Sequence, residues 1–322
     1  MQTIAPLWLW ATFAAIVAVA LWVDFSVLKR QGPRETGFRQ ALNWSLVWVA
    51  VSLAFNGLLW WALRQTTGDA ELATARALEF FTGYLLEKSL AVDNIFVFLM
   101  IFSYFAVPPA YQKRVLMIGV LGAIVLRAVM IFLGAWLLAQ FHWVLYLFGA
   151  FLLLTGVKMW FAAGEEPSLD DNPALRLLKR VLPVSAHYDG ERFWTRENGV
   201  RLATPLLMVV ALVALTDVVF AVDSIPAIFA ITTDPFIVLT SNVFAVLGLR
   251  AMYFLLVAVA ARFHLLSYGL ALILVFIGSK MLIVDFVKIP IAVSLGVVLA
   301  ILVGAMLLSL RGASTRAEPS SR

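Results

Sequence analysis

Two short stretches place pairs of acidic residues inside otherwise apolar sequence. The stretch LEKSLAVDN carries Glu87 and Asp93, and the later stretch TDVVFAVDS carries Asp217 and Asp223. A lone aspartate at the centre of a membrane helix costs about 2.5–3.5 kcal/mol, so carboxylates at this depth mark ion pathways or paired networks. The repeated pairs therefore predict a functional cation site within the membrane.

Neutral oxygen donors follow both pairs. Asn94 comes directly after the first Ala-Val-Asp, and Ser224 comes directly after the second. The chain has no cysteine and only three histidines, so its available ligands suit hard divalent ions such as Mn²⁺, Ca²⁺ or Mg²⁺ better than zinc or copper. We expect a site built from carboxylate, amide and hydroxyl oxygens.

The spacing within each pair limits how its members can meet. Residues six apart on a helix diverge by about 120°, so one pair shares a site only if the helix is interrupted or if both stretches contribute ligands. Pro226 follows Asp223 by three residues and removes the hydrogen bond that would end on the Val222 carbonyl. We expect a broken helix there, with the Val222 carbonyl as a further ligand. The first stretch has no such proline, only Gly83.

Basic residues within the apolar runs could balance these charges: Lys88, Arg127, Lys158, Arg250 and Lys280. The two arginines fall in mid-run and are expected to face the acidic residues as counter-ions or gating groups, whereas the last two lysines can extend toward an interface. A static salt-bridge network and a proton relay are the alternatives.

A further acidic residue, Asp24, lies near the end of the first apolar run. It either joins the path or meets the lipid headgroups.

The elements that carry these residues are predicted to be membrane-spanning helices. The chain has 322 residues, of which 63% are hydrophobic and 13% charged, far from the balance of a soluble protein. Apolar runs of about twenty residues recur without the alternation typical of barrel strands. We therefore expect an all-α polytopic bundle of about nine spans, near residues 7–28, 41–63, 77–102, 114–140, 143–161, 203–231, 236–260, 266–285 and 289–310.

The loops between these spans differ sharply in charge. With the N-terminus outside, sixteen basic residues fall in inside loops and only Arg64, Arg76 and Lys288 fall outside. The positive-inside rule then predicts a periplasmic N-terminus and a cytoplasmic C-terminus. This topology, with anionic lipid as a partner, accounts for the net charge of +5, so we do not expect nucleic-acid binding.

Further motifs repeat in the same order as the acidic stretches. LRAV (126–129) matches LRAM (249–252), and GVKM (156–159) matches GSKM (278–281), at nearly equal intervals. Each copy holds three spans, an odd number, so two inverted repeats are predicted with the site between them. The single membrane domain, 1–322, then divides into two N-terminal spans (7–63), the first repeat (77–161), a cytoplasmic connecting loop (162–202), the second repeat (203–285), a last span (289–310) and a disordered cytoplasmic tail (311–322).

The chain lacks the motifs of the common hydrolases. It has no HExxH, no glycine-rich phosphate loop and no nucleophile placed beside a base. We therefore expect a protein that is not an enzyme and that needs no cofactor, with its oligomeric state left open.

Longer runs resemble a known family. GYLLEKSLAVDNIFVFLMIF (83–102), FHWVLYLFGAFLLLTGVKMW (141–160), TDVVFAVDSIPAIFAIT (216–232) and SNVFAVLGLRAMYFLL (241–256) are similar to the tellurium resistance protein C (TerC) family, in particular its Alx type, within the wider LysE-like transporter group. The resemblance implies a bacterial inner-membrane protein that exports manganese. It also implies that the four paired acidic residues are the transport residues.

The residues leave other functions open beside manganese export. Oxygen ligands do not separate Mn²⁺ from Ca²⁺, so a Ca²⁺/H⁺ or other cation exchanger is one alternative. A membrane scaffold in a stress response, with a structural ion at the acidic site, is the other.

Overall fold

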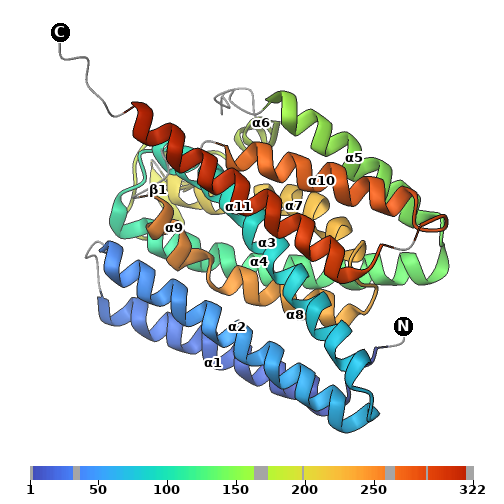
Figure 1. The fold of residues 1–322 in the computed structure, drawn as a ribbon. Helices are drawn as coiled ribbons and strands as arrows, with labels where there is room; N and C mark the ends of the chain where they lie inside the picture. Colours follow the sequence, from blue (N-terminus) through green and yellow to red (C-terminus); the bar gives the residue numbers. More distant parts are fainter. Residues whose placement is uncertain are drawn as a thin grey trace.

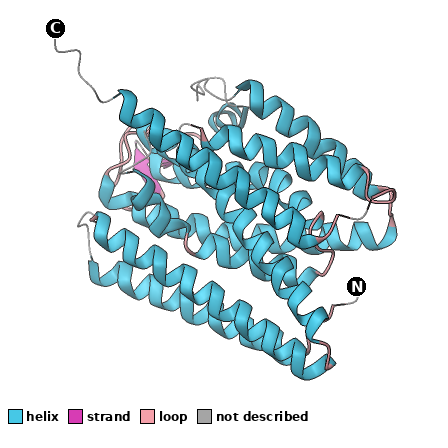
Figure 2. Ribbon diagram, in the orientation of Figure 1, coloured by secondary structure: helices cyan, strands magenta, loops and turns pink. Residues whose placement is uncertain are grey.

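Long helices account for nearly all of the protein (Figures 1 and 2). The structure is a computed structural model that describes residues 3–31, 37–162, 173–197, 199–257, 265–287 and 289–316. Its elements are α1 (Leu7–Gln31), α2 (Phe38–Thr67), α3 (Ala70–Tyr104), α4 (Pro109–Gln140), α5 (Val144–Ala162), α6 (Pro173–Val181), β1 (Trp194–Glu197), β2 (Val200–Ala203), α7 (Pro205–Phe229), α8 (Pro235–Leu247), α9 (Leu249–Val257), α10 (Leu266–Leu282) and α11 (Ile291–Arg316).

Local sequence signals fix several helix ends. Gly68 closes α2 in the left-handed conformation, with φ of 71°, and the next residue, Asp69, caps α3 by accepting from the amides of Glu71 and Leu72 at 2.9 and 3.0 Å. Thr204 and Asp234 cap α7 and α8 in the same way, each just before a proline at the first helical position. These are the preferred residues at helix starts and ends, so the local sequence explains where these helices begin and end.

Six helices are long and apolar enough to cross a membrane, and seven are if the bent pair α8–α9 counts as one crossing. Two further predicted spans coincide with helices that fall short of this standard. The helix α3 carries Glu87, Lys88 and Asp93 near its middle, and α10 has only 17 residues. The expectation of an all-helical polytopic membrane protein is thus confirmed, with six or seven spans as the number supported by length and composition.

The two ends of the chain lie at opposite ends of the bundle (Figure 1). The hairpin of β1 and β2 lies at the end near the C-terminus, and the turn between α2 and α3 lies at the end near the N-terminus. The basic hairpin and the turn between α2 and α3 therefore lie at opposite ends of the bundle.

The core is deepest around α8. All 13 residues of this helix are buried, and its Phe236 and Phe244 join Phe13, Phe55 and Phe80 in an aromatic cluster with ring centroids as close as 4.7 Å. Such edge and tilted contacts add to the area that these rings bury. The cluster fastens α8 to α1, α2 and α3.

The helices α5 and α10 approach each other at backbone distance. A Cβ atom added to Gly156 would lie 2.8 Å from the Val275 amide nitrogen, and one added to Gly278 would lie 2.6 Å from the Leu153 amide nitrogen. Small residues allow membrane helices to pack this closely, because lipid supplies no hydrophobic drive between them. The GVKM and GSKM motifs therefore contribute the glycines of one helix crossing.

The connection between α5 and α7 has more structure than expected. The predicted loop, 162–202, contains α6 and the antiparallel hairpin of β1 with β2, and its residues 163–172 and 198 lie outside the described part. Tyr188 donates a hydrogen bond of 2.7 Å to the Phe105 carbonyl, and burial raises the pKa of this tyrosine. The connection is thus attached to the turn between α3 and α4.

Two predicted boundaries need correction. The C-terminal helix α11 continues to Arg316, so the expected tail from 311 begins as helix, and residues 317–322 lie outside the described part. The other difference lies within α7, which runs without interruption from Pro205 to Phe229 and includes Pro226.

The break that we expected near Pro226 occurs elsewhere. The chain bends by 43° between α8 and α9, where Gly248 separates the two helices. Pro226 removes only the hydrogen bond to the Val222 carbonyl, and the helix continues for just three residues beyond it. The interruption therefore belongs to the next helix of the chain.

Candidate functional site

A guanidinium group holds two of the predicted carboxylates together. Arg127 donates from Nη2 and Nε to the two Asp217 oxygens at 3.0 and 3.2 Å, and its Nη1 pairs with Glu87 Oε1. The side chains of Arg127 and Glu87 are 0% exposed. A two-pronged bond of this kind fixes both distance and orientation. The structure thus brings one acidic residue from each stretch to a single buried cation.

Three helices supply this cluster. Glu87 lies on α3, Arg127 on α4 and Asp217 on α7. One carboxylate from each stretch therefore meets at Arg127, whereas shared binding of a metal ion by the two stretches stays a prediction.

The face of α7 explains which residues can join. Asp217 and Ser224 are seven residues apart, about two turns, so they share the buried face of the helix. Asp223 points about a third of a turn away and is half-buried. The positive charge of Lys158, on α5, acts on the Asp223 carboxylate. The Lys158 side chain is exposed. The second stretch therefore sends Asp217 and Asp223 to different neighbours.

Three buried polar atoms, one each on α3, α7 and α8, have no hydrogen-bond partner within the described chain. They are Glu87 Oε2, Ser224 Oγ and the amide nitrogen of Asn242. Buried polar groups are nearly always paired with protein, water or an ion, so such atoms call for a ligand. Two of the three are oxygens, as a hard cation requires.

Asn242 is a member of the cluster that sequence reasoning missed. Its side-chain oxygen lies 3.4 Å from Arg127 Nη1, and the residue is 0% exposed on α8. The signal was present as an amide within the apolar run SNVFAVL. An amide inside a membrane helix commonly hydrogen-bonds to a neighbouring helix, so it marks a polar contact within the bundle.

The second arginine lies elsewhere. The structure places Arg250 of α9 against Asp24 of α1, through a bond from Nη2 to Oδ1, rather than against Glu87 or Asp217. Both side chains are 10% exposed. Asp24 is therefore a buried partner of the second LRA motif.

The lysines make separate contacts. Lys280 Nζ lies 3.0 Å from the Ser294 hydroxyl at the start of α11, and Lys88 Nζ donates to the Ala245 carbonyl at 3.2 Å. Neither contact is with a carboxylate of the Arg127 cluster. Lys88 in particular turns away from its neighbour Glu87 and toward α8.

The remaining predicted ligands are placed only in part. Asn94 is buried on α3, and Asp93 falls on the same helix with its side chain outside the described part. The Val222 side chain is exposed, 42%, on the continuous helix α7. Among the residues whose side chains are described, no three acidic or histidine groups converge as a ready metal site.

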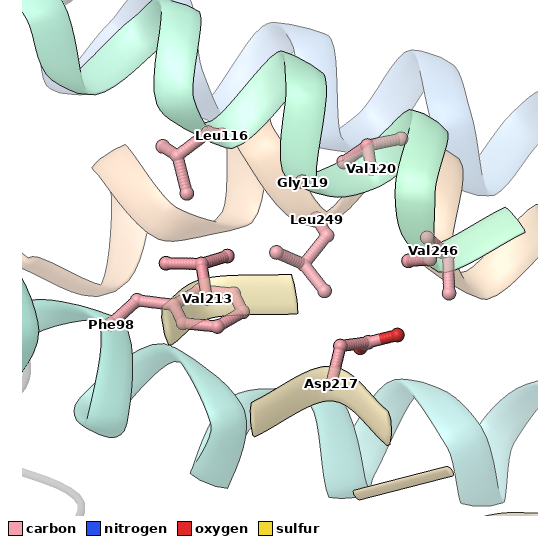
Figure 3. Close-up of a pocket in the computed structure, with 9 residues that line it drawn as sticks. Phe98, Leu116, Gly119, Val120, Val213, Asp217, Val246 and Leu249 are labelled. Carbon is pink, nitrogen blue, oxygen red and sulfur yellow. The ribbon is translucent and has the colours of Figure 1, made fainter. Parts of the chain in front are cut away.

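A small cavity reaches the cluster from one side (Figure 3). Apolar side chains line it, and Asp217 projects into it from α7. The space for the centre of a water-sized molecule is about 10 Å³, about what one water needs. Val246 and Leu249, on either side of the α8–α9 break, belong to its wall. The Asp217 carboxylate is therefore the polar group of a small cavity whose wall is otherwise apolar.

Comparison with known proteins identifies the relatives of this chain. Residues 72–317 match the integral membrane protein TerC family. The chain belongs to the TerC family. This confirms the resemblance seen in the sequence, and the matched segment contains every residue of the Arg127 cluster.

Individual relatives cover nearly the whole chain. Proteins named "Putative membrane-bound redox modulator Alx" from Shigella flexneri and Escherichia coli (strain K12) are 61% identical over 303 residues, which is 94% of this chain and 94% of theirs. A protein of Myxococcus xanthus named "Uncharacterized membrane protein STKORF319" is 48% identical over 94% of this chain and 92% of its own. No solved structure matches. This TerC protein is therefore a multi-pass integral membrane protein with bacterial relatives.

Proposed function

We propose that this TerC protein is a secondary transporter that exports a divalent cation, in the first place Mn²⁺, from the cytoplasm without changing it chemically. The observation that carries the proposal is the Arg127 cluster, in which one guanidinium pairs with carboxylates from α3 and α7 whose side chains are 0% and 5% exposed. In the proposed cycle, Arg127 occupies the acidic site when the substrate is absent.

Charge balance favours a divalent substrate. Glu87 and Asp217 together carry two negative charges, and Arg127 returns one positive charge. A divalent cation would neutralise the two carboxylates fully, whereas a monovalent cation would do no more than Arg127 does. Because uncompensated charge is expensive in a low dielectric, this difference supports selection by charge.

Further oxygens could complete the coordination. Glu87 Oε2 and Ser224 Oγ are buried without partners in the described chain, and Asn94 is buried nearby in sequence. Asp93 and Asp223, with the Val222 carbonyl, would take part as the substrate moves. Lys158, which acts on Asp223, would be the second internal counter-ion, and Lys280 its counterpart in the other copy.

Contacts between helices support the two inverted repeats. The contact of Gly156 with Val275 and that of Gly278 with Leu153 are the same contact with the two copies exchanged. A second exchange holds to within one residue: Gly83 of α3 lies beside Ser241 of α8, and Val213 of α7 lies beside Gly119 of α4. Reciprocal contacts of this kind are expected where two copies meet about a two-fold axis.

The proposed location is the bacterial inner membrane, with the N-terminus periplasmic. Nine crossings, counting α3, α10 and the bent pair, agree with chain ends at opposite sides of the bundle (Figure 1). The hairpin and α6 carry Arg176, Lys179, Arg180, Arg192, Arg196 and Arg201. Positive charge of this density fits the cytoplasmic side and its anionic lipids.

The relatives' name refers to redox modulation. These 322 residues contain no cysteine, so the chain itself offers no thiol for redox exchange. We therefore regard a redox effect as a consequence of metal traffic rather than as chemistry at this site.

The experiment compares carboxylate variants in cells that lack other manganese exporters. Asp217→Asn and Glu87→Gln should raise cellular manganese and abolish growth at high manganese, because each leaves one charge for a divalent ion. Asp24→Asn is the matched control, since its partner is Arg250, and it should retain most of the export. Each variant is measured at equal membrane abundance.

Two outcomes would redirect the proposal. Unchanged manganese levels in Asp217→Asn cells would contradict export through this cluster and would favour a scaffold role with a structural ion. In vesicles, uptake of Ca²⁺ that excess Mn²⁺ fails to inhibit would favour calcium exchange instead.

A further inference from the structure

The break between α8 and α9 lies beside the proposed transport site. The buried helix α8 ends at Leu247, Gly248 follows, and α9 begins at Leu249 after a bend of 43°. A helix that ends in the protein interior leaves carbonyl oxygens that need donors. The C-terminal end also carries partial negative charge, which favours a cation.

Lys88 supplies that cation. Its Nζ donates to the Ala245 carbonyl at 3.2 Å, in the last turn of α8. A Cβ atom added to Gly248 would lie 2.6 Å from this same Nζ and 3.1 Å from Trp48 Cβ. A side chain at residue 248 would therefore displace the ammonium group from its present position against the break.

The contact connects the break with the cluster. Lys88 follows Glu87, which pairs with Arg127, and Ala245 lies one turn after Asn242, which also contacts Arg127. Val246 and Leu249 flank Gly248 and wall the cavity into which Asp217 projects (Figure 3). A change of the angle between α8 and α9 would thus move both Asn242 and the wall of this cavity.

We infer that Lys88 is a positioning residue that acts as a built-in cation on the broken end of α8 and holds the passage to Asp217 closed. The inference rests on the proposed function for its role in transport, and its geometry stands apart from the identity of the substrate. Opening of the passage then requires the ammonium to leave the Ala245 carbonyl.

The natural absence of cysteine makes this testable by labelling. Ala123→Cys places one thiol in the cavity wall, and its reaction with N-ethylmaleimide is timed in purified full-length protein in detergent. Adding Lys88→Met, which keeps length but removes charge, should raise the labelling rate about tenfold or more, because a hydrogen bond from a charged donor is lost. Gly248→Ala should do the same by displacing Lys88, whereas Lys88→Arg should stay within about threefold of the starting rate.

Controls separate opening of the passage from general loosening. Gly57→Ala, where an added Cβ meets nothing within 4 Å, should leave the rate at Ala123→Cys unchanged. Leu59→Cys, buried in the aromatic core, should label equally slowly with and without Lys88→Met. Faster labelling at both sites, or an unchanged rate at Ala123→Cys in Lys88→Met and Gly248→Ala, would overturn the inference.

The transport assay gives an independent answer. If Asp217→Asn retains manganese export while Lys88→Met still raises the labelling rate, the proposed function is wrong and the inferred role of Lys88 is supported. If Asp217→Asn loses export and Lys88→Met leaves labelling unchanged, the reverse holds.

Discussion

Arg127 and Arg250 occupy matching positions in the LRAV and LRAM motifs, yet their surroundings differ. Arg127 is wholly buried between Glu87 and Asp217. Arg250 pairs with Asp24 on α1, a helix outside both proposed repeats, and keeps 10% exposure. The comparison teaches that a repeated motif preserves the backbone position of a charge while its partner is chosen by whatever helix packs alongside.

The difference assigns distinct tasks to the two arginines. Arg127 joins α3 to α7 across the proposed site, so its release would change the charge that a substrate meets. Arg250 joins α9 to α1 near the end of the bundle, so its release would mainly loosen the first helix. Under the proposed function, the first arginine takes part in transport and the second stabilises the packing of α1.

Loss of the central arginine should have the largest effect. Arg127→Met leaves two buried carboxylates without a counter-charge, and breaking a buried pair in this way costs about 3–5 kcal/mol. We expect strongly reduced membrane abundance and a clear drop in the midpoint of thermal unfolding in detergent. Arg250→Met is the matched variant, and an equal loss in both would remove the distinction between the two sites.

The glycines at the crossing of α5 and α10 test whether the two proposed repeats pack in the same way. Gly156→Ala and Gly278→Ala each force a Cβ against backbone nitrogen, at 2.8 and 2.6 Å, and overpacking of this kind costs about 1–3 kcal/mol. Thermal unfolding of each variant should show similar losses. A loss in only one of them would argue against reciprocal packing of the two copies.

A double-mutant cycle on the peripheral pair should give a smaller effect. Asp24→Asn, Arg250→Met and the double variant are compared by denaturant unfolding, with a coupling energy of about 1–2 kcal/mol expected for a pair that is mostly buried. Manganese export should remain in all three once abundance is matched. Loss of export at normal abundance would place Asp24 in the transport path after all.

The smallest expected effect is a gain in the free energy of unfolding. Gly122 lies in α4, five residues before Arg127, and an added Cβ there meets nothing within 4 Å. Gly122→Ala should stabilise the helix by about 0.5–1 kcal/mol through its backbone alone. A slightly higher unfolding midpoint with unchanged export is the expected measurement, and a loss would show that α4 must flex beside Arg127.

The sequence predicted the helices and the charged positions well because both depend on local patterns. Apolar runs gave the crossings, and the unusual cost of charge in lipid singled out Glu87, Arg127 and Asp217. It could not predict that Asp24 would partner Arg250, since those residues lie 226 positions apart and many helix arrangements would have satisfied each charge.

The helix break shows the same limit from another side. Pro226 was the stronger breaker by local rules, but it lies within the last turn of α7 and the helix passes through it. The bend occurs instead at Gly248, where Lys88 and Trp48 from two distant segments leave little room for a side chain. Tertiary packing therefore decided which weak point of the chain became the bend.

The ion pair between Asp24 and Arg250 cannot form until both residues have been synthesised. Synthesis at roughly 5–20 residues per second would separate the two residues by roughly 10–50 s. Over that interval the newly inserted first helix must hold its aspartate against lipid, headgroups or a passing insertion factor. Slowing the ribosome between the two would lengthen this exposed state, so the yield of this protein in the membrane is tied to the pace of its own translation.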